Sequence, residues 1–169
     1  FARAREVLEF FVEFTASAPD ELHLDCAIVA PPGAKPMVVL EVCYSGDLAT
    51  GEKVIAPLRA FIKPLADQVK AMPYLKLQTG GDEANAAGRN YYVKSGFVES
   101  VDPRLLDAMT AGFSAAAGRT TVMVLQQLGG AIGRVRPDAT AFNHRKASFD
   151  LLVLGSWEDP GQTPQHSTW

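Results

Sequence analysis

The chain has 169 residues, of which 47% are hydrophobic, 21% charged and 9% aromatic. This apolar content excludes an intrinsically disordered chain and predicts one domain with a single core. The formal net charge of -3, from 16 basic and 19 acidic side chains, argues against nucleic acid and anionic membranes as partners. Since no apolar stretch is long enough to span a bilayer, we expect a soluble, cytoplasmic protein.

The first half of the chain predicts a helix followed by a β-hairpin. Apolar side chains recur at helical spacing over residues 2–17, and alternate with polar ones over 21–30 and 37–45. The intervening residues 31–36 are rich in Pro and Gly, which favours a tight antiparallel turn. The apolar stripe of the helix consists of Val7, Phe10, Phe11 and Phe14.

Alternation assigns side chains of the hairpin to two faces. Cys26 belongs to the apolar face, whereas Cys43 shares the opposite face with Asp25, Ala27 and Glu41. A disulfide between the two cysteines is therefore not expected, which agrees with a reducing compartment.

The middle of the chain predicts a second helix, a loop and a third strand. Apolar spacing indicates a helix over 51–61, with Pro57 near its first turns and Pro64 ending it. Small residues and a Gly pair mark a surface loop over 72–88. Residues 90–99 are strand-like.

The last part predicts one more helix and two strands. Asp102 and Pro103 form a typical helix start, and Gly118 is placed to end that helix. Residues 119–128 and 148–157 are β-rich apolar runs. We therefore predict an α+β fold with an antiparallel or mixed sheet and its helices on one face, in a ferredoxin-like arrangement. The opposite face would be washed by solvent or covered by something outside this chain.

Common catalytic and metal motifs are not supported. The Gly-rich run at 128–133 lacks the first Gly of a dinucleotide fingerprint, so we interpret it as a bend between strands. The three histidines have no metal-ligand spacing, and no nucleophile-elbow motif occurs.

Three polar features interrupt this apolar background. Phe142–Arg145 is either a loop pinned by its Arg or a functional loop. Asp150 lies inside an apolar strand, where a carboxylate needs edge exposure, a partner or a ligand. Gln126 and Gln127 end an apolar strand and are either solvated or functional.

Several blocks in colinear order resemble bacterial FAD-linked oxidases of the berberine bridge enzyme type. The blocks are RAREVL at 3–8, Tyr74 with Gln78, GRNYYVKSGF at 88–97, QQLGGA at 126–131, DATAFNHR at 138–145 and WEDP at 157–160. The match is to the substrate-binding domain of this family and covers essentially the whole chain.

This resemblance implies a role within a larger enzyme. Residues 1–169 would be the substrate-binding domain of a longer protein, expected here without its N-terminal FAD-binding domain and C-terminal segment. FAD, bound mainly by the missing domain, would take a hydride from a small organic substrate, with oxygen as the usual final acceptor. Expected partners are therefore a small-molecule substrate and the FAD domain of the same polypeptide. The alternative is a stand-alone ferredoxin-like module that binds a small molecule or forms a homodimer through its open sheet face.

The resemblance also implies site residues. Gln126 occupies a position where relatives carry a Tyr or Glu base, but a neutral amide cannot abstract a proton and is expected to orient substrate. Asp150 matches a pocket carboxylate and is the candidate catalytic residue. Ala27 matches a pocket-facing His of plant members, on the same open face as Glu41.

Four further residues complete the predicted substrate site. His144 and Arg145 are expected to shape the loop beside the pocket. Tyr92 and Lys94 alternate on one strand face, so either both meet the pocket or both point away from it.

Overall fold

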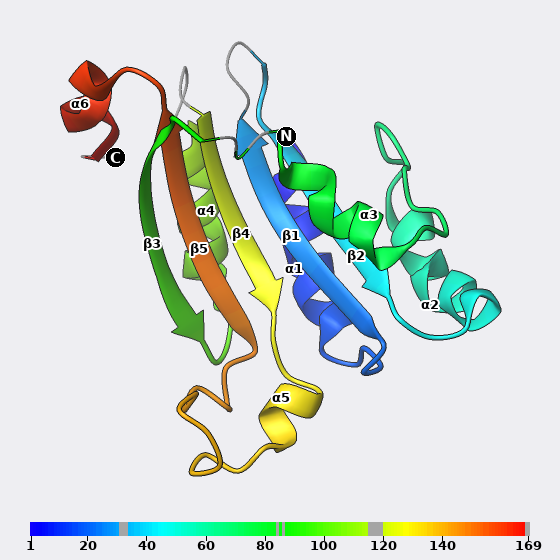
Figure 1. The fold of residues 1–169 in the computed structure, drawn as a ribbon. Coiled ribbons are helices and arrows are strands. Elements are labelled where there is room, and N and C mark those ends of the chain that lie inside the picture. Colours follow the sequence, from blue (N-terminus) through cyan, green and yellow to red (C-terminus); the bar gives the residue numbers. More distant parts are fainter. Residues whose placement is uncertain (31–33, 84, 86, 115–119, 168–169) are drawn as a thin grey trace.

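The computed structural model describes residues 1–30, 34–83, 85, 87–114 and 120–167. Its centre is a five-stranded sheet (Figure 1). The strands are β1 (Leu22–Ala30), β2 (Met37–Tyr44), β3 (Asn90–Val98), β4 (Thr120–Gln127) and β5 (Phe149–Trp157). They lie in the order β2-β1-β4-β5-β3, and each neighbouring pair is antiparallel. The predicted α+β class is confirmed, and the strand order is compatible with a ferredoxin-like arrangement.

Two helices cover one face of the sheet. In Figure 1, α1 (Ala4–Thr15) and α4 (Pro103–Ser114) lie behind the strands. The core between the two layers consists of Leu8, Phe11, Leu24, Cys26, Ile28, Ala30, Leu106, Met109, Phe113, Met123, Leu125 and Phe149. The predicted end of the second of these helices, at Gly118, lies outside the described residues.

The buried stripe of α1 differs from the prediction. The buried residues are Ala4, Leu8, Phe11 and Thr15, so only Phe11 of the predicted stripe is fully buried. Phe10 lies at the flank, where its ring stacks on Phe61 with 3.9 Å between centroids. One side of α1 thus packs on the sheet, and the side that carries Phe10 contacts Phe61 of a later helix.

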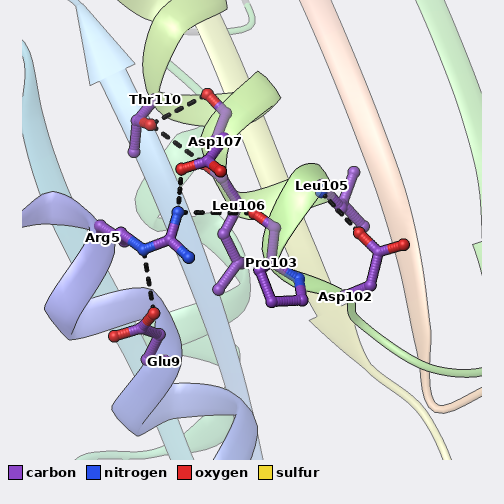
Figure 2. A network of polar contacts seen from close by, with 8 residues as sticks. All are labelled: Arg5, Glu9, Asp102, Pro103, Leu105, Leu106, Asp107 and Thr110. Atoms are coloured by element: carbon purple, nitrogen blue, oxygen red, sulfur yellow. Dashed lines mark hydrogen bonds and ion pairs between the residues drawn. The ribbon is translucent and has the colours of Figure 1, made fainter.

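An arginine joins the two covering helices. Arg5 of α1 donates from Nε to Glu9 at 2.9 Å, and its Nη1 reaches the Asp107 carboxylate and the Pro103 carbonyl of α4 (Figure 2). At the start of α4, the Asp102 carboxylate accepts from the Leu105 backbone N–H at 2.9 Å and caps the helix. These contacts join α1 to α4 and cap the start of α4.

The second helix and the loop after it correct two predictions. Helix α2 (Leu48–Phe61) begins earlier than expected because Asp47 caps it, accepting from the Thr50 N–H at 2.9 Å. Pro57 lies inside this helix rather than near its first turns. The predicted loop contains the short helix α3 (Tyr74–Gln78) and the 3₁₀ turn η1 (Thr79–Gly81).

The connection from β4 to β5 also contains a helix that the sequence did not predict. Gly129 and Gly130 have φ of 104° and 51°, a left-handed region that favours glycine. A Cβ on Gly130 would lie 3.0 Å from the Asp20 carboxylate. The bend is therefore confirmed, but the four-residue helix α5 (Ala131–Arg134) follows it directly. After β5, the turn η2 (Pro160–Gln162) leads into α6 (Thr163–Ser167), which packs on β5 and β3.

Candidate functional site

The two faces of the sheet have different environments. Along β1, residues Leu22, Leu24, Cys26, Ile28 and Ala30 are buried beneath the helices, and the residues between them are not. The antiparallel register carries this alternation across all five strands, because directly paired residues point to the same face. The side of the sheet nearest the viewer in Figure 1 is therefore its open face.

One row of directly paired residues crosses the whole open face. The registers pair Glu41 of β2 with Asp25 of β1, Asp25 with Gln126 of β4, Gln126 with Asp150 of β5, and Asp150 with Phe97 of β3. We call these five residues the polar row. Three carboxylates, one amide and one aromatic ring thus lie side by side, contributed by every strand of the sheet. The structure brings together Glu41, Gln126 and Asp150, which the sequence had singled out separately.

Asp25 is the hydrogen-bonding centre of the polar row. Its Oδ1 accepts from the Gln127 backbone N–H at 3.2 Å and lies 3.1 Å from His23 Nε2. Its Oδ2 accepts from Gln126 Nε2 at 3.4 Å. The hydrogen bond to Asp25 raises the pKa of His23 above its ordinary value, with smaller contributions from the charges of Asp25 and Glu41.

The two glutamines have different roles. Gln127 is structural, since its Oε1 accepts from the Leu24 backbone N–H at 2.9 Å. Gln126 is on the open face, and its amide N–H group is held by Asp25. Both side chains are thus hydrogen-bonded within the protein rather than only to solvent.

Asp150 does not lie on a sheet edge. Its strand β5 is paired on both sides, with β4 and with β3, so edge exposure does not explain this carboxylate. Its Oδ1 is buried and has no hydrogen-bond partner among the described residues. A buried oxygen without a donor is costly, which points to a role other than structural stabilisation.

The aromatic end of the row is covered by the loop after α5. The His144 ring stacks on Phe97 with 4.0 Å between centroids, and Phe142 meets Phe97 edge-on at 5.5 Å. Arg145 lies over the Phe142 ring and donates to the Ile132 carbonyl at 3.3 Å and to the Thr140 hydroxyl. Arg145 thus pins the loop, and His144 stacks on Phe97, the residue that pairs with Asp150 across β3 and β5.

On the side of the polar row toward Ala27, the open face is mostly apolar. The row next to the polar row pairs Val39, Ala27, Val124, Leu152 and Ser95 in that order across the sheet. Ala27 therefore lies directly beside the polar row, on the face where the sequence placed it. Val39 and Val93 are exposed to solvent in this structure. An apolar surface next to a polar row can bind a molecule with an apolar body and a polar reacting group.

Tyr92 and Lys94 lie on the other face of the sheet. Their partners on β5 are Gly155 and Val153, which alternate with Asp150, Leu152 and Leu154. Lys94 Nζ lies 5.7 Å from the Tyr92 ring centroid, so the two side chains accompany each other away from the polar row. The structure does not bring them together with the other predicted site residues.

Three residues of the site were not singled out from the sequence as site residues. They are His23, Asp25 and Phe97, which belong to the open face by alternation or by pairing. The alternation of β1 carried the signal for the first two. For Phe97 the only signal is its pairing with Asp150, which requires the sheet order.

The next features are the two cysteines and the side chains that could bind a metal ion. Cys26 is buried among the core and Cys43 lies on the open face opposite His23, and both are free. Burial raises the pKa of the Cys26 thiol to about 12. Within the described part of the chain, no group of His, Cys, Asp and Glu is arranged to hold a metal ion, and no helix is long and apolar enough to cross a membrane.

The structure thus defines an α+β domain in which one sheet face is closed by helices and the other presents a polar row. No family model matches the chain. It is 29% identical over 124 residues to an uncharacterized FAD-linked oxidoreductase, YgaK, of Bacillus subtilis. The match covers 70% of this chain and 27% of that protein.

Solved structures share the fold over nearly the whole chain. BBE-like 1 of Physcomitrella patens and 6-hydroxy-D-nicotine oxidase of Arthrobacter nicotinovorans each superpose with a TM-score of 0.79 at 16% identity. Each superposition covers 99% of this chain and 38% of the other. The resemblance to oxidases of the berberine bridge enzyme type is confirmed at the level of fold, and the chain spans less than two fifths of the length of these relatives.

Proposed function

We propose that residues 1–169 are the substrate-binding domain of an FAD-dependent oxidoreductase that oxidises a small organic substrate. The observation that carries this proposal is the polar row on an uncovered sheet face, in a domain whose fold recurs in FAD-linked oxidases. The similarity to an FAD-linked oxidoreductase in sequence supports the same conclusion independently.

The open face is suited to pack against an apolar ring system. Val39 and Val93 are exposed beside the polar row, and Phe97 at its end keeps part of its ring exposed although His144 and Phe142 pack on it. A bound flavin would supply the hydride acceptor, with oxygen as the final acceptor. In this chain, the apolar rows would contact the cofactor and substrate rings, and the polar row would hold the reacting group.

Proton transfer in this domain is assigned to Asp150. Its carboxylate can accept a proton from a substrate hydroxyl or amine, whereas the Gln126 amide cannot. Phe97, the residue paired with Asp150 on the next strand, carries the His144 ring stacked on it. Gln126 and Glu41 then contact the substrate, and Arg145 holds the loop that carries His144.

The exposed apolar residues support an FAD domain of the same polypeptide as the partner. Between α2 and β3, the side chains of Leu65, Tyr74 and Leu75 are exposed, Leu65 to 99% of its surface. In Figure 1, α3 lies in front of the sheet, on the side of the open face. Apolar side chains exposed in a defined segment are typical of a surface that packs against another unit.

The test is the full-length protein. Purified from cells, it should carry the yellow absorbance bands of a flavin, and it should consume oxygen when presented with a library of small alcohols and amines. A colourless protein that gains no flavin on incubation with FAD would contradict the proposal. A protein that stays a monomer in that state would also exclude the homodimer alternative.

A further inference from the structure

We propose that Asp25 is a positioning residue: it fixes the Gln126 amide so that the Gln126 carbonyl oxygen, beside Asp150, accepts a hydrogen bond from a donor on the substrate. The inference rests on the proposed function, because it names the substrate chemistry of the same polar row. The site would select an alcohol or an ammonium group over a carboxylate.

The hydrogen bonds of Asp25 leave it little freedom. One carboxylate oxygen faces the Gln127 backbone N–H and His23, and the other faces the Gln126 amide. The side chain of Asp25 is 15% exposed, so water competes little for these positions. Because β1 and β4 are hydrogen-bonded neighbours, the carboxylate is held from both strands at once.

The orientation of the Gln126 amide follows from its neighbour. An ionised carboxylate only accepts hydrogen bonds, so the amide must turn its NH₂ group toward Asp25. Its carbonyl oxygen and its second amide N–H are then left for other contacts, and no donor among the described residues reaches the carbonyl oxygen. Gln126 can therefore accept a hydrogen bond from a donor on the substrate through this oxygen.

The charges around Gln126 favour the same kind of ligand. Asp25 and Asp150 lie on the two sides of Gln126, and Glu41 follows Asp25 in the row. His23 is the basic side chain that meets this group, and its contact is with Asp25. The nearby Arg145 donates from its two terminal nitrogens to the Ile132 carbonyl and the Thr140 hydroxyl, while its buried Nε has no hydrogen-bond partner among the described residues. A substrate carboxylate would thus meet acceptors and negative charge, which is unfavourable.

The experiment compares three ligands of one shape. Benzylamine, which is an ammonium ion at neutral pH, benzyl alcohol and benzoate are titrated into the full-length protein by calorimetry. The wild type should bind the two donor-bearing probes about tenfold more tightly than benzoate. Tighter binding of benzoate, or no binding of either donor probe at millimolar concentration, would overturn the proposal.

Variants separate positioning from general damage. Gln126→Met removes the acceptor at similar size and should abolish most of the preference. Asp25→Asn offers one side-chain oxygen where the wild type uses two, so it should lose a similar part of the preference for the donor-bearing probes. The double variant should lose little more of this preference than either single variant. The control Asp107→Asn makes the same chemical change on the helical layer, where Asp107 pairs with Arg5, and should keep the wild-type preference.

The outcomes are distinct from those of the flavin test. Calorimetry reports binding whether or not the protein carries FAD, so a colourless protein with the predicted preference contradicts only the oxidoreductase proposal. A yellow, active protein whose preference is unchanged in Asp25→Asn and Gln126→Met contradicts only the positioning role. If Asp25→Asn does not fold, the result for Gln126→Met still decides whether this amide selects donors.

Discussion

The two faces of the sheet come from the same five strands and differ in what encloses them. Beneath α1 and α4, side chains such as Leu24, Ile28 and Leu125 are fully buried. On the open face, their immediate neighbours in sequence include Asp25 and Gln126. The covered face accounts for stability through apolar burial, whereas the open face carries polar groups, one of which, the buried Oδ1 of Asp150, has no hydrogen-bond partner among the described residues. Substitutions on the two faces should therefore have separable effects.

The largest expected effect is on stability, from the covered face. Leu125→Ala should lower the free energy of unfolding of the full-length protein by about 2–5 kcal/mol, because it leaves a cavity in a fully buried site. Val124→Ala, one residue earlier on the open face, is the matched control and should cost much less. Denaturant unfolding measures both, and equal losses would show that the two faces do not differ as described.

The next effect is on catalysis, from the open face. Asp150→Asn should lower turnover about 100-fold, as expected when a general base is removed, and change unfolding free energy by less than about 1 kcal/mol. Asp107→Asn serves as the control on the helical side. Steady-state rates and unfolding midpoints are the measurements. Unchanged turnover would remove Asp150 from proton transfer.

The reactivity of the two cysteines should differ between the two faces of the sheet. Cys26 is buried with a pKa of about 12, so an alkylating reagent at neutral pH should leave it unmodified until the protein unfolds. Cys43, half-buried on the open face, should react first. Mass spectrometry of the peptides after timed labelling reads the order. Earlier labelling of Cys26 would mean that the covered face opens more readily than the open one.

The smallest effect is the pH dependence from His23. Because its pKa is raised in the folded state, protonated His23 contributes stability that is present below its ordinary pKa near 6.5 and lost as the pH rises through the raised value. The contribution is a fraction of a kcal/mol, since the His23 side chain is 54% exposed and solvent screens the pair. NMR titration should show a lower His23 pKa in Asp25→Asn, and the same pKa in both proteins would show that the pair does not form.

Most of the fold could be predicted from local patterns. The alternation at 21–30 and 37–45 predicts the hairpin and the opposite faces of Cys26 and Cys43, and both are confirmed. The position of Pro57 was misjudged because proline usually starts or ends a helix, while here Asp47 caps the helix well before it. The helix α3 was missed because its side chains are exposed and carry no apolar stripe.

The site could be predicted only in part. Asp150 and Gln126 stood out because polar groups in apolar strands are unusual, but nothing in the sequence shows that they are direct neighbours. On β3, the sequence offers two alternating sets of side chains for the open face. One set is Tyr91, Val93 and Phe97, and the other is Tyr92 and Lys94. Only the pairing with β5 shows which set accompanies Asp150. Long-range pairing, which local alternation does not encode, assembles the polar row.

That assembly has a consequence for how the protein is made. Gln126 and Asp25 meet across β1 and β4 although they are 101 residues apart in the chain. A growing chain that has not yet reached β4 cannot contain this contact. Non-local strand pairing of this kind slows folding relative to local structure, so ligand recognition would emerge only after β4 has inserted between β1 and β5. Incomplete chains would therefore be unable to compete for substrate.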